Sequence, residues 1–216
     1  MSMKGLFKSF FSSEEEKTIR ELNHPRDLNQ NDIIKFRFSA QSELSNKRFQ
    51  ISNVNTYDFE DRKLTEFTLS GDNKEPIYLI IDETGDEPFL SISRKIQRNI
   101  VEQLFDLEEF SQIFDSEAHT SLKRLNNLQS LEGWTTESYI QEIYAEGGYF
   151  HKGDYRNKLV PQNEDAGEYF DYYLAIDDTR QFVIEAEVYD GGETDVLITI
   201  RRPLTDIEEM WPSEAS

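Results

Sequence analysis

Two stretches of this chain decide the fold that its sequence predicts: PIYLIIDETGDEPFLSISRKI, residues 76–96, and QFVIEAEVYDGGETDVLITIRRPL, residues 181–204. Each has the pattern of a β-strand, an acidic turn with glycine, a second strand and a basic pair. With the preceding strands included, residues 66–96 align with residues 171–204 at an offset of 105 to 107 positions. The similarity has two explanations, an internal duplication or two unrelated β-meanders with acidic turns, and both stay open.

Alternation of apolar and polar residues extends the strand pattern over most of the chain. The predicted strands cover residues 34–38, 47–54, 64–69, 77–81, 89–93, 169–176, 181–189 and 195–202. The stretch ESYIQEIYAEGGYFHKGDY, residues 137–155, is interpreted as a strand, a Gly-Gly turn and another strand. In residues 94–114 the apolar side chains recur at helical spacing instead, which predicts an amphipathic helix.

The predicted fold class is α+β and β-rich, with two similar antiparallel β-meander or partial-barrel lobes and a linking amphipathic helix. Capping boxes at Ser13 and Glu16 and at Thr205 and Glu208 predict a helix near each end of the sequence. The predicted domains are an N-terminal amphipathic segment and helix (1–27), a first β lobe (28–96), a helical linker (97–132) and a second β lobe with a short C-terminal helix (133–216).

The composition limits the classes of partner. Lys and Arg number 23 against 43 Asp and Glu, which gives a formal net charge of −20. Such a surface repels the phosphates of nucleic acids, so no nucleic acid partner is expected. It favours cations, basic proteins or solubility alone. Fifteen Phe and ten Tyr indicate a folded chain, because disordered chains are poor in aromatic residues.

Several common chemistries have no support in the sequence. There is no Cys, which excludes disulfides, thiol catalysis and Cys-ligated metals and fits a cytoplasmic location. Three His residues far apart, at positions 24, 119 and 151, make no zinc motif. The phosphate-binding glycine patterns and the hydrolase G-x-S-x-G are absent, and the acidic turns do not fit a calcium loop. We therefore expect no metal, no cofactor and no catalytic residue.

Tyrosines gather near acids in the second half of the chain. Carboxylates and aromatic faces together suit ammonium groups, although tyrosine is also common in ordinary strands and protein interfaces. Glu185 and Glu187 share one strand face, which we interpret as a solvated face, with acid–base chemistry as the alternative. The candidate residues for binding a cation or a partner are Tyr169, Tyr172, Tyr173, Asp177, Asp178, Glu185 and Glu187.

The N-terminal stretch KGLFKSFF places four apolar side chains at helical spacing: Leu6, Phe7, Phe10 and Phe11. These side chains pack on the protein's own core, or they dock on a membrane surface or in a partner's groove.

The stretches DLNQNDIIKF, EFTLSGDNKEPIYLIID and FLSISRKI resemble the YjfK-like and related bacterial families of unknown function, as does the opening GLFKSFF. The resemblance covers residues 28–96 and, more weakly, residues 169–204. It implies a cytoplasmic accessory protein, with association at the inner face of the membrane as one alternative. Genes of these families are often neighbours of phage-shock and polyamine-related genes. It carries over no functional residue.

The functional prediction is a non-enzymatic binding or scaffolding protein with an acidic surface. The preferred partner is another protein, one with a basic patch. One alternative is binding of a polyamine or another cation. Another is an enzyme whose paired carboxylates meet only in the fold. A deep pocket that joins two carboxylates, one with a raised pKa, would favour the enzyme, whereas a shallow acidic surface would favour binding.

Overall fold

The computed structural model describes residues 20–72, 75–85, 87–115, 120–161 and 167–213. The N-terminal segment with Leu6, Phe7, Phe10 and Phe11 and the first predicted capping box lie outside the described residues.

Eleven strands form one antiparallel sheet in the described residues, which confirms the β-rich prediction. They are β1 (Ile33–Phe36), β2 (Arg48–Phe59), β3 (Lys63–Ser70), β4 (Ile77–Asp82), β5 (Phe89–Ile96), β6 (Ser121–Lys123), β7 (Ser138–His151), β8 (Glu168–Ile176), β9 (Phe182–Tyr189), β10 (Thr194–Pro203) and β11 (Ile207–Trp211). The helices are α1 (Arg98–Leu104) and α2 (Leu107–Ser111), with single 3₁₀ turns at Pro25–Asp27, Gln112–Phe114, Gln129–Leu131 and Leu204–Asp206.

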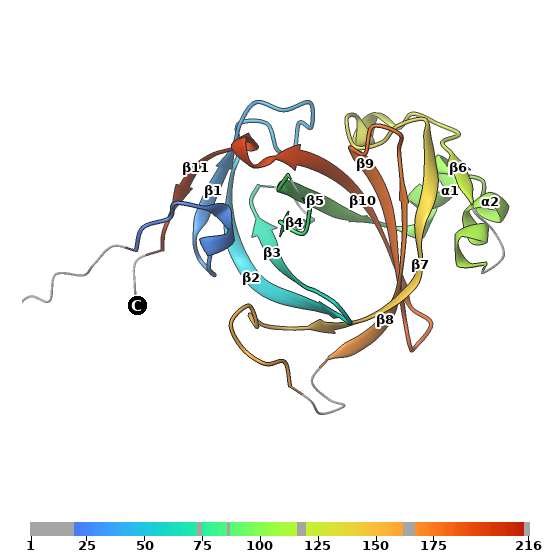
Figure 1. Ribbon diagram of the computed structural model, residues 1–216. Helices are drawn as coiled ribbons and strands as arrows, with labels where there is room; N and C mark the ends of the chain where they lie inside the picture. The colour runs from blue at the N-terminus through green and yellow to red at the C-terminus, as the bar shows by residue number, and fades with distance from the viewer. Residues whose placement is uncertain (1–19, 73–74, 86, 116–119, 162–166, 214–216) are drawn as a thin grey trace, which may run out of the picture.

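Eight of these strands close into a barrel (Figure 1). Strands β2 to β5 form one meander and strands β7 to β10 form a second. The two meanders join at both edges, because β5 pairs with β10 along its whole length and the end of β2 pairs with β7. They are therefore the two halves of one closed sheet. An eight-stranded barrel has an interior wide enough for side chains or for one small ligand.

The two meanders have the same strand order, as an internal duplication requires. Ser93 and Thr199 occupy equivalent positions 106 residues apart, and they are direct partners in the pairing of β5 with β10. Their hydroxyl oxygens lie 2.7 Å apart. The two quoted stretches thus occupy corresponding places in the two meanders, and they meet at this pair.

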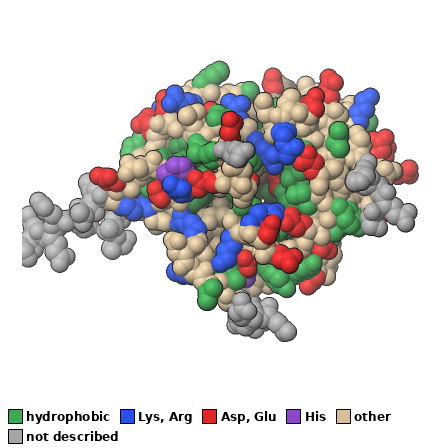
Figure 2. All heavy atoms as spheres, viewed as in Figure 1, with side chains coloured by type: hydrophobic (Ala, Val, Ile, Leu, Met, Phe, Trp, Pro, Cys, Tyr) green, Lys and Arg blue, Asp and Glu red, His purple; other side chains and the backbone are tan. Residues whose placement is uncertain are grey.

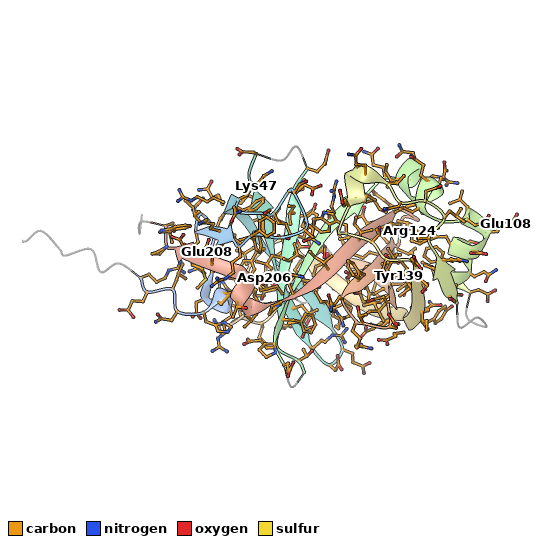
Figure 3. The ribbon with its side chains drawn as sticks, turned by 90° about the horizontal axis from the view of Figure 1, so that it is seen from above. Lys47, Glu108, Arg124, Tyr139, Asp206 and Glu208 are labelled. Carbon is orange, nitrogen blue, oxygen red and sulfur yellow. The ribbon has the colours of Figure 1, made fainter. Side chains whose placement is uncertain are left out.

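The main apolar core lies on the outer face of the barrel. Ile92, Ile184 and Ile198 alternate with the inward side chains of β5, β9 and β10, and they belong to one buried cluster with Leu104 and Trp134 from the connecting segment. Figure 1 shows α1 and α2 outside the ring of strands, with β1 and β11 on the opposite side. Figure 3 shows the same division from above, with Asp206 and Glu208 at one end and Arg124 and Tyr139 toward the other.

The predicted helical linker, residues 97–132, is helical only in part: it contains α1 and α2, but Ser121–Lys123 forms strand β6, which pairs with β7. Strand β5 continues to Ile96, and the backbone of Phe105, between α1 and α2, is extended. Asp106 then caps α2, because its side chain accepts hydrogen bonds from the backbone N–H groups of Glu108 and Glu109. Phe105 is buried against Phe110 and Tyr139 in the outer core, so packing and the cap override the helical periodicity.

The C-terminal helix predicted from Thr205 and Glu208 is a single 3₁₀ turn, Leu204–Asp206, followed by strand β11. Pairing of β11 with β1 prevails there over the local capping signal. Within the described parts of the chain, none of the helices combines the length and the apolar character needed to cross a bilayer.

The Gly-Gly turn predicted between two strands is wrong, because β7 runs without a break through Gly147 and Gly148. These glycines serve a close approach of aromatic rings. A Cβ atom on Gly148 would lie 2.8 Å from Cζ of Phe170 and 3.0 Å from Cδ1 of Phe59. Since Gly148 is paired with both of these residues, the absence of a side chain lets β2, β7 and β8 meet where the barrel closes.

We predict that Gly148→Ala lowers the free energy of unfolding by about 1–3 kcal/mol, the usual cost of overpacking a buried site. The matched control is Gly191→Ala, because a Cβ atom at this exposed turn residue would meet nothing within 4 Å. This control is expected to change stability by no more than about 0.5 kcal/mol. Urea unfolding followed by tryptophan fluorescence measures both variants. Equal stability of the two would refute the close ring packing at the closure.

Candidate functional site

The interior of the barrel contains a cluster of acids and tyrosines. Tyr57 on β2 donates a hydrogen bond to Oε1 of Glu187 on β9 over 2.9 Å, and Oε2 of Glu66 on β3 lies 3.4 Å from the same hydroxyl oxygen. In the closed sheet β7 and β8 separate β2 from β9, so the Tyr57–Glu187 contact crosses the interior. The cluster therefore joins the two meanders from within.

Glu185 lies on the same strand face as Glu187, two residues before it. Tyr172 donates a hydrogen bond to Oε2 of Glu185 over 2.5 Å, and the hydroxyl of Thr199 also bonds this carboxyl. Tyr189 donates to Oε2 of Glu187 over 2.7 Å. The tyrosine hydroxyls thus hold the carboxyls in fixed orientations.

Burial controls the protonation of this cluster. Glu187 is 3% exposed and Glu66 is 4% exposed. Loss of hydration raises the pKa of Glu187 to about 7 and also raises the pKa of Glu66, while hydrogen bonds from the tyrosines oppose the change. Burial raises the pKa values of Tyr57 and Tyr172 well above the usual value for tyrosine, so both hydroxyls remain donors at neutral pH.

Aromatic rings line one part of the interior, and an aliphatic cluster of Leu174, Ile176 and Val183 lies in another. Phe170 packs edge to face on Tyr57 and on Phe59, with ring centroids 5.5 and 5.7 Å apart. Tyr172 contacts Phe59 at 5.8 Å, and Phe150 contacts Tyr57 at 5.1 Å. The carboxyls consequently face a wall of aromatic rings.

Two cavities reach the cluster. One of about 220 Å³ is lined by Glu66, Glu185, Glu187, Tyr172 and Arg201, among others. A more open one of about 700 Å³ reaches the surface near the β9–β10 turn, where its lining includes Tyr189, Asp190, Glu193 and Asp195. Tyr57, Glu66 and Tyr78 line both cavities, so the two spaces meet at these three side chains.

An ammonium group already lies at the larger cavity. The Nζ atom of Lys95 forms an ion pair with Asp195 and lies 5.9 Å from the ring centroid of Tyr78. A cation between a carboxylate and a tyrosine ring is therefore part of this wall.

The structure brings some of the sequence-predicted residues together and separates others. Tyr172, Glu185 and Glu187 meet in the interior, and Tyr169 lines the larger cavity. Tyr173 lies on the outer face, where its ring packs on Phe114 at 5.0 Å.

Asp177 and Asp178 belong to the turn between β8 and β9. The side chain of Asp177 accepts hydrogen bonds from the backbone N–H groups of Thr179, Gln181 and Phe182, so it organises the turn. Asp178 is exposed in the same turn.

The interpretation of the β9 acids as a solvated face is wrong for Glu187, because closure of the barrel buries that face. Sequence reasoning also missed Tyr57 and Glu66 on the first meander. Glu66 lies in the run LTEFTL, where it shares a strand face with Leu64 and Thr68. Nothing local to that pattern distinguishes a polar residue inside a barrel from one in water.

In the described part of the chain, no three His, Cys, Asp or Glu side chains are arranged to hold a metal ion. No protein-family model matches this chain, and neither a curated protein nor a solved structure matches it.

We predict that Glu187→Gln removes a pH dependence of stability. The unfolded carboxyl ionises near pH 4.5 and the folded one near pH 7, so the unfolded state loses its proton first as pH rises. The wild-type protein therefore loses stability between these values, by about 3 kcal/mol at most, and the variant does not lose this part. Urea unfolding at pH 5 and pH 8 measures the effect.

The control for this measurement is Glu132→Gln, which changes an exposed acid by the same atom. It should follow the wild-type pH dependence. If Glu187→Gln follows it too, the proposed burial of an ionisable Glu187 is incorrect.

Proposed function

We propose that the barrel binds a small organic cation, such as a polyamine or another amine, in its interior. The observation that supports this most directly is that Glu66, Glu185 and Glu187 line one cavity together with the aromatic rings of Tyr57, Phe59, Tyr78 and Tyr172. An ammonium group is attracted both by carboxylates and by the negative faces of aromatic rings. The proposal takes up the cation-binding alternative from the sequence and locates it inside the fold.

The electrostatic state of the cluster supports a cationic ligand. Across the described ranges, no Lys or Arg forms an ion pair with Glu66, Glu185 or Glu187. Burial is costly for a carboxylate that forms no ion pair, which is why Glu187 holds its proton to about pH 7, although Lys95 attracts Glu66 and Glu187 from the larger cavity. A bound ammonium would add positive charge next to Glu187 and lower that pKa, with release of a proton.

We predict that spermidine binds to the wild-type protein and that its affinity rises from pH 6 to pH 8, as Glu187 loses its proton. The double variant Glu185→Gln/Glu187→Gln should bind at least about tenfold more weakly, because two charge-assisted contacts are lost. Calorimetry in two buffers of different ionisation enthalpy measures both the affinity and the proton release.

The matched control is Glu132→Gln/Glu137→Gln, which replaces two exposed acids. It reduces the net negative charge of the protein by the same amount as the interior double variant. Its affinity should stay close to that of the wild type at moderate salt. If both double variants weaken binding alike, spermidine binds the general acidic surface and the interior site is refuted.

A second candidate, a carboxylate-based enzyme, has one specific observation in its favour. Glu187 with a pKa of about 7 and the buried Glu66 both reach the hydroxyl of Tyr57 from a cavity. A carboxyl with a pKa near the working pH suits general acid–base catalysis. These are the features that would favour an enzyme over a binding protein.

We predict that a bound amine remains chemically unchanged, as simple binding requires. Overnight incubation of each ligand with the protein, followed by proton NMR of the ligand, checks this. Conversion by the wild-type protein but not by Glu187→Gln would favour the enzyme instead. Variant Glu132→Gln is again the control.

A protein partner with a basic patch, a cytoplasmic location and an association with the inner face of the membrane remain predictions. Their support is the net charge of −20 together with the sequence features given above.

A further inference from the structure

We infer that the ligand of the barrel carries an anionic group as well as its ammonium group, and that Arg201 receives this anion. The inference rests on the proposed function, because it concerns the same cavity. It narrows the ligand class from amines to zwitterions that contain an amine and a carboxylate.

Arg201 forms no direct ion pair in the described part of the chain, although Glu142 lies close enough for Arg201 to lower the pKa of its carboxyl. Its side chain lines the cavity of about 220 Å³ together with Glu185 and Glu187. Among the described residues it has no ion pair and no side-chain hydrogen bond, and its Nε atom is buried without a partner. The guanidinium lies over the ring of Phe89, with 4.8 Å between Cζ and the ring centroid.

Two neighbouring arginines, by contrast, form ion pairs with carboxylates. Arg62, which lines the same cavity, bonds both carboxylate oxygens of Glu146, over 2.5 and 2.8 Å. Arg202, the next residue, bonds Asp206 over 2.7 Å. In a chain with 43 acids, an arginine that lines a cavity with a buried, unpaired Nε is exceptional. A buried donor without an acceptor is costly, so a ligand that supplies the acceptor is favoured.

The chemistry of the guanidinium selects the anion. Its planar N–H groups match the two oxygens of a carboxylate, and such paired contacts are stronger than contacts between neutral groups. One mouth of the barrel faces the viewer in Figure 1, and Figure 2 shows Lys and Arg side chains near the centre of this face despite the acidic composition. Anionic ligands are therefore not repelled everywhere on this molecule.

The register of β10 indicates how far apart the two charges of the ligand are. Thr199, which bonds the carboxyl of Glu185, lies two residues before Arg201 on the same strand face. Two residues span about 7 Å along a strand. An ammonium held at the glutamates and a carboxylate held at Arg201 are thus separated by several bonds, as in an aminoalkanoate with a terminal amine. The cavity has the volume of roughly seven water molecules at about 30 Å³ each, which admits such a compound.

The test compares three ligands with the same five-carbon length: pentylamine, 1,5-diaminopentane and 5-aminopentanoate. Each is titrated calorimetrically into the wild-type protein, Arg201→Gln and the control Arg202→Gln. For the wild type and the control, 5-aminopentanoate should bind at least about tenfold more tightly than pentylamine. In Arg201→Gln this advantage should vanish, while pentylamine binds as well as before or better. Thermal unfolding of both variants verifies that they fold.

The outcomes separate this inference from the function on which it rests. Equal affinity of the wild type for all three ligands overturns the anion site and leaves amine binding intact. Loss of pentylamine and 5-aminopentanoate binding to the same extent in Arg201→Gln assigns Arg201 a structural role and also overturns it. Failure of all three ligands and of spermidine to bind the wild type refutes the proposed function itself.

Discussion

Closure of the sheet is the constraint on which the rest of this structure depends. Strands β5 and β10 pair along one seam, and β2 and β7 pair along the other. Without the second seam the two meanders would form an open sheet, and one face of β9 would be in water. With the second seam, that face lines the interior of the barrel, and the hydroxyl of Tyr57 on β2 reaches Glu187 on β9 across it. Gly148 permits the seam because a larger residue would collide with the rings that fill it.

The polar interior explains why the apolar core is outside. A barrel filled with aliphatic side chains could leave its outer face polar, but here the inner face carries acids and hydroxyls beside two small apolar clusters. The outer face must then bury the apolar area that stabilises the fold, so the connecting segments cover it. Glu43 ties this cover to the barrel, because it accepts a hydrogen bond from Arg94 of β5 over 2.5 Å and another from the indole of Trp134 over 3.2 Å.

Retention of the buried Glu66 and Glu187 inside the barrel is costly for stability, and burial raises the pKa of both carboxyls. The hydrogen bonds from Tyr57 and Tyr189 compensate Glu187 only in part, since its pKa stays near 7. Carboxyls and an arginine that form no direct ion pair line one cavity, and this arrangement supports the proposed recognition of a ligand. This is the physical link between the architecture and the binding role proposed for it.

The sequence by itself determined the β-rich class, most of the strands and the similarity of the two meanders, because strand alternation and turn residues are local signals. It also indicated Tyr172, Glu185 and Glu187 as chemically notable. It could not show that Glu187 is buried, or that Tyr57 and Glu66 join it, because alternation reports two faces without stating which one meets water. Only the tertiary structure decided that: hydrogen bonds between strands distant in sequence close the barrel, and closure turns a polar face into a site.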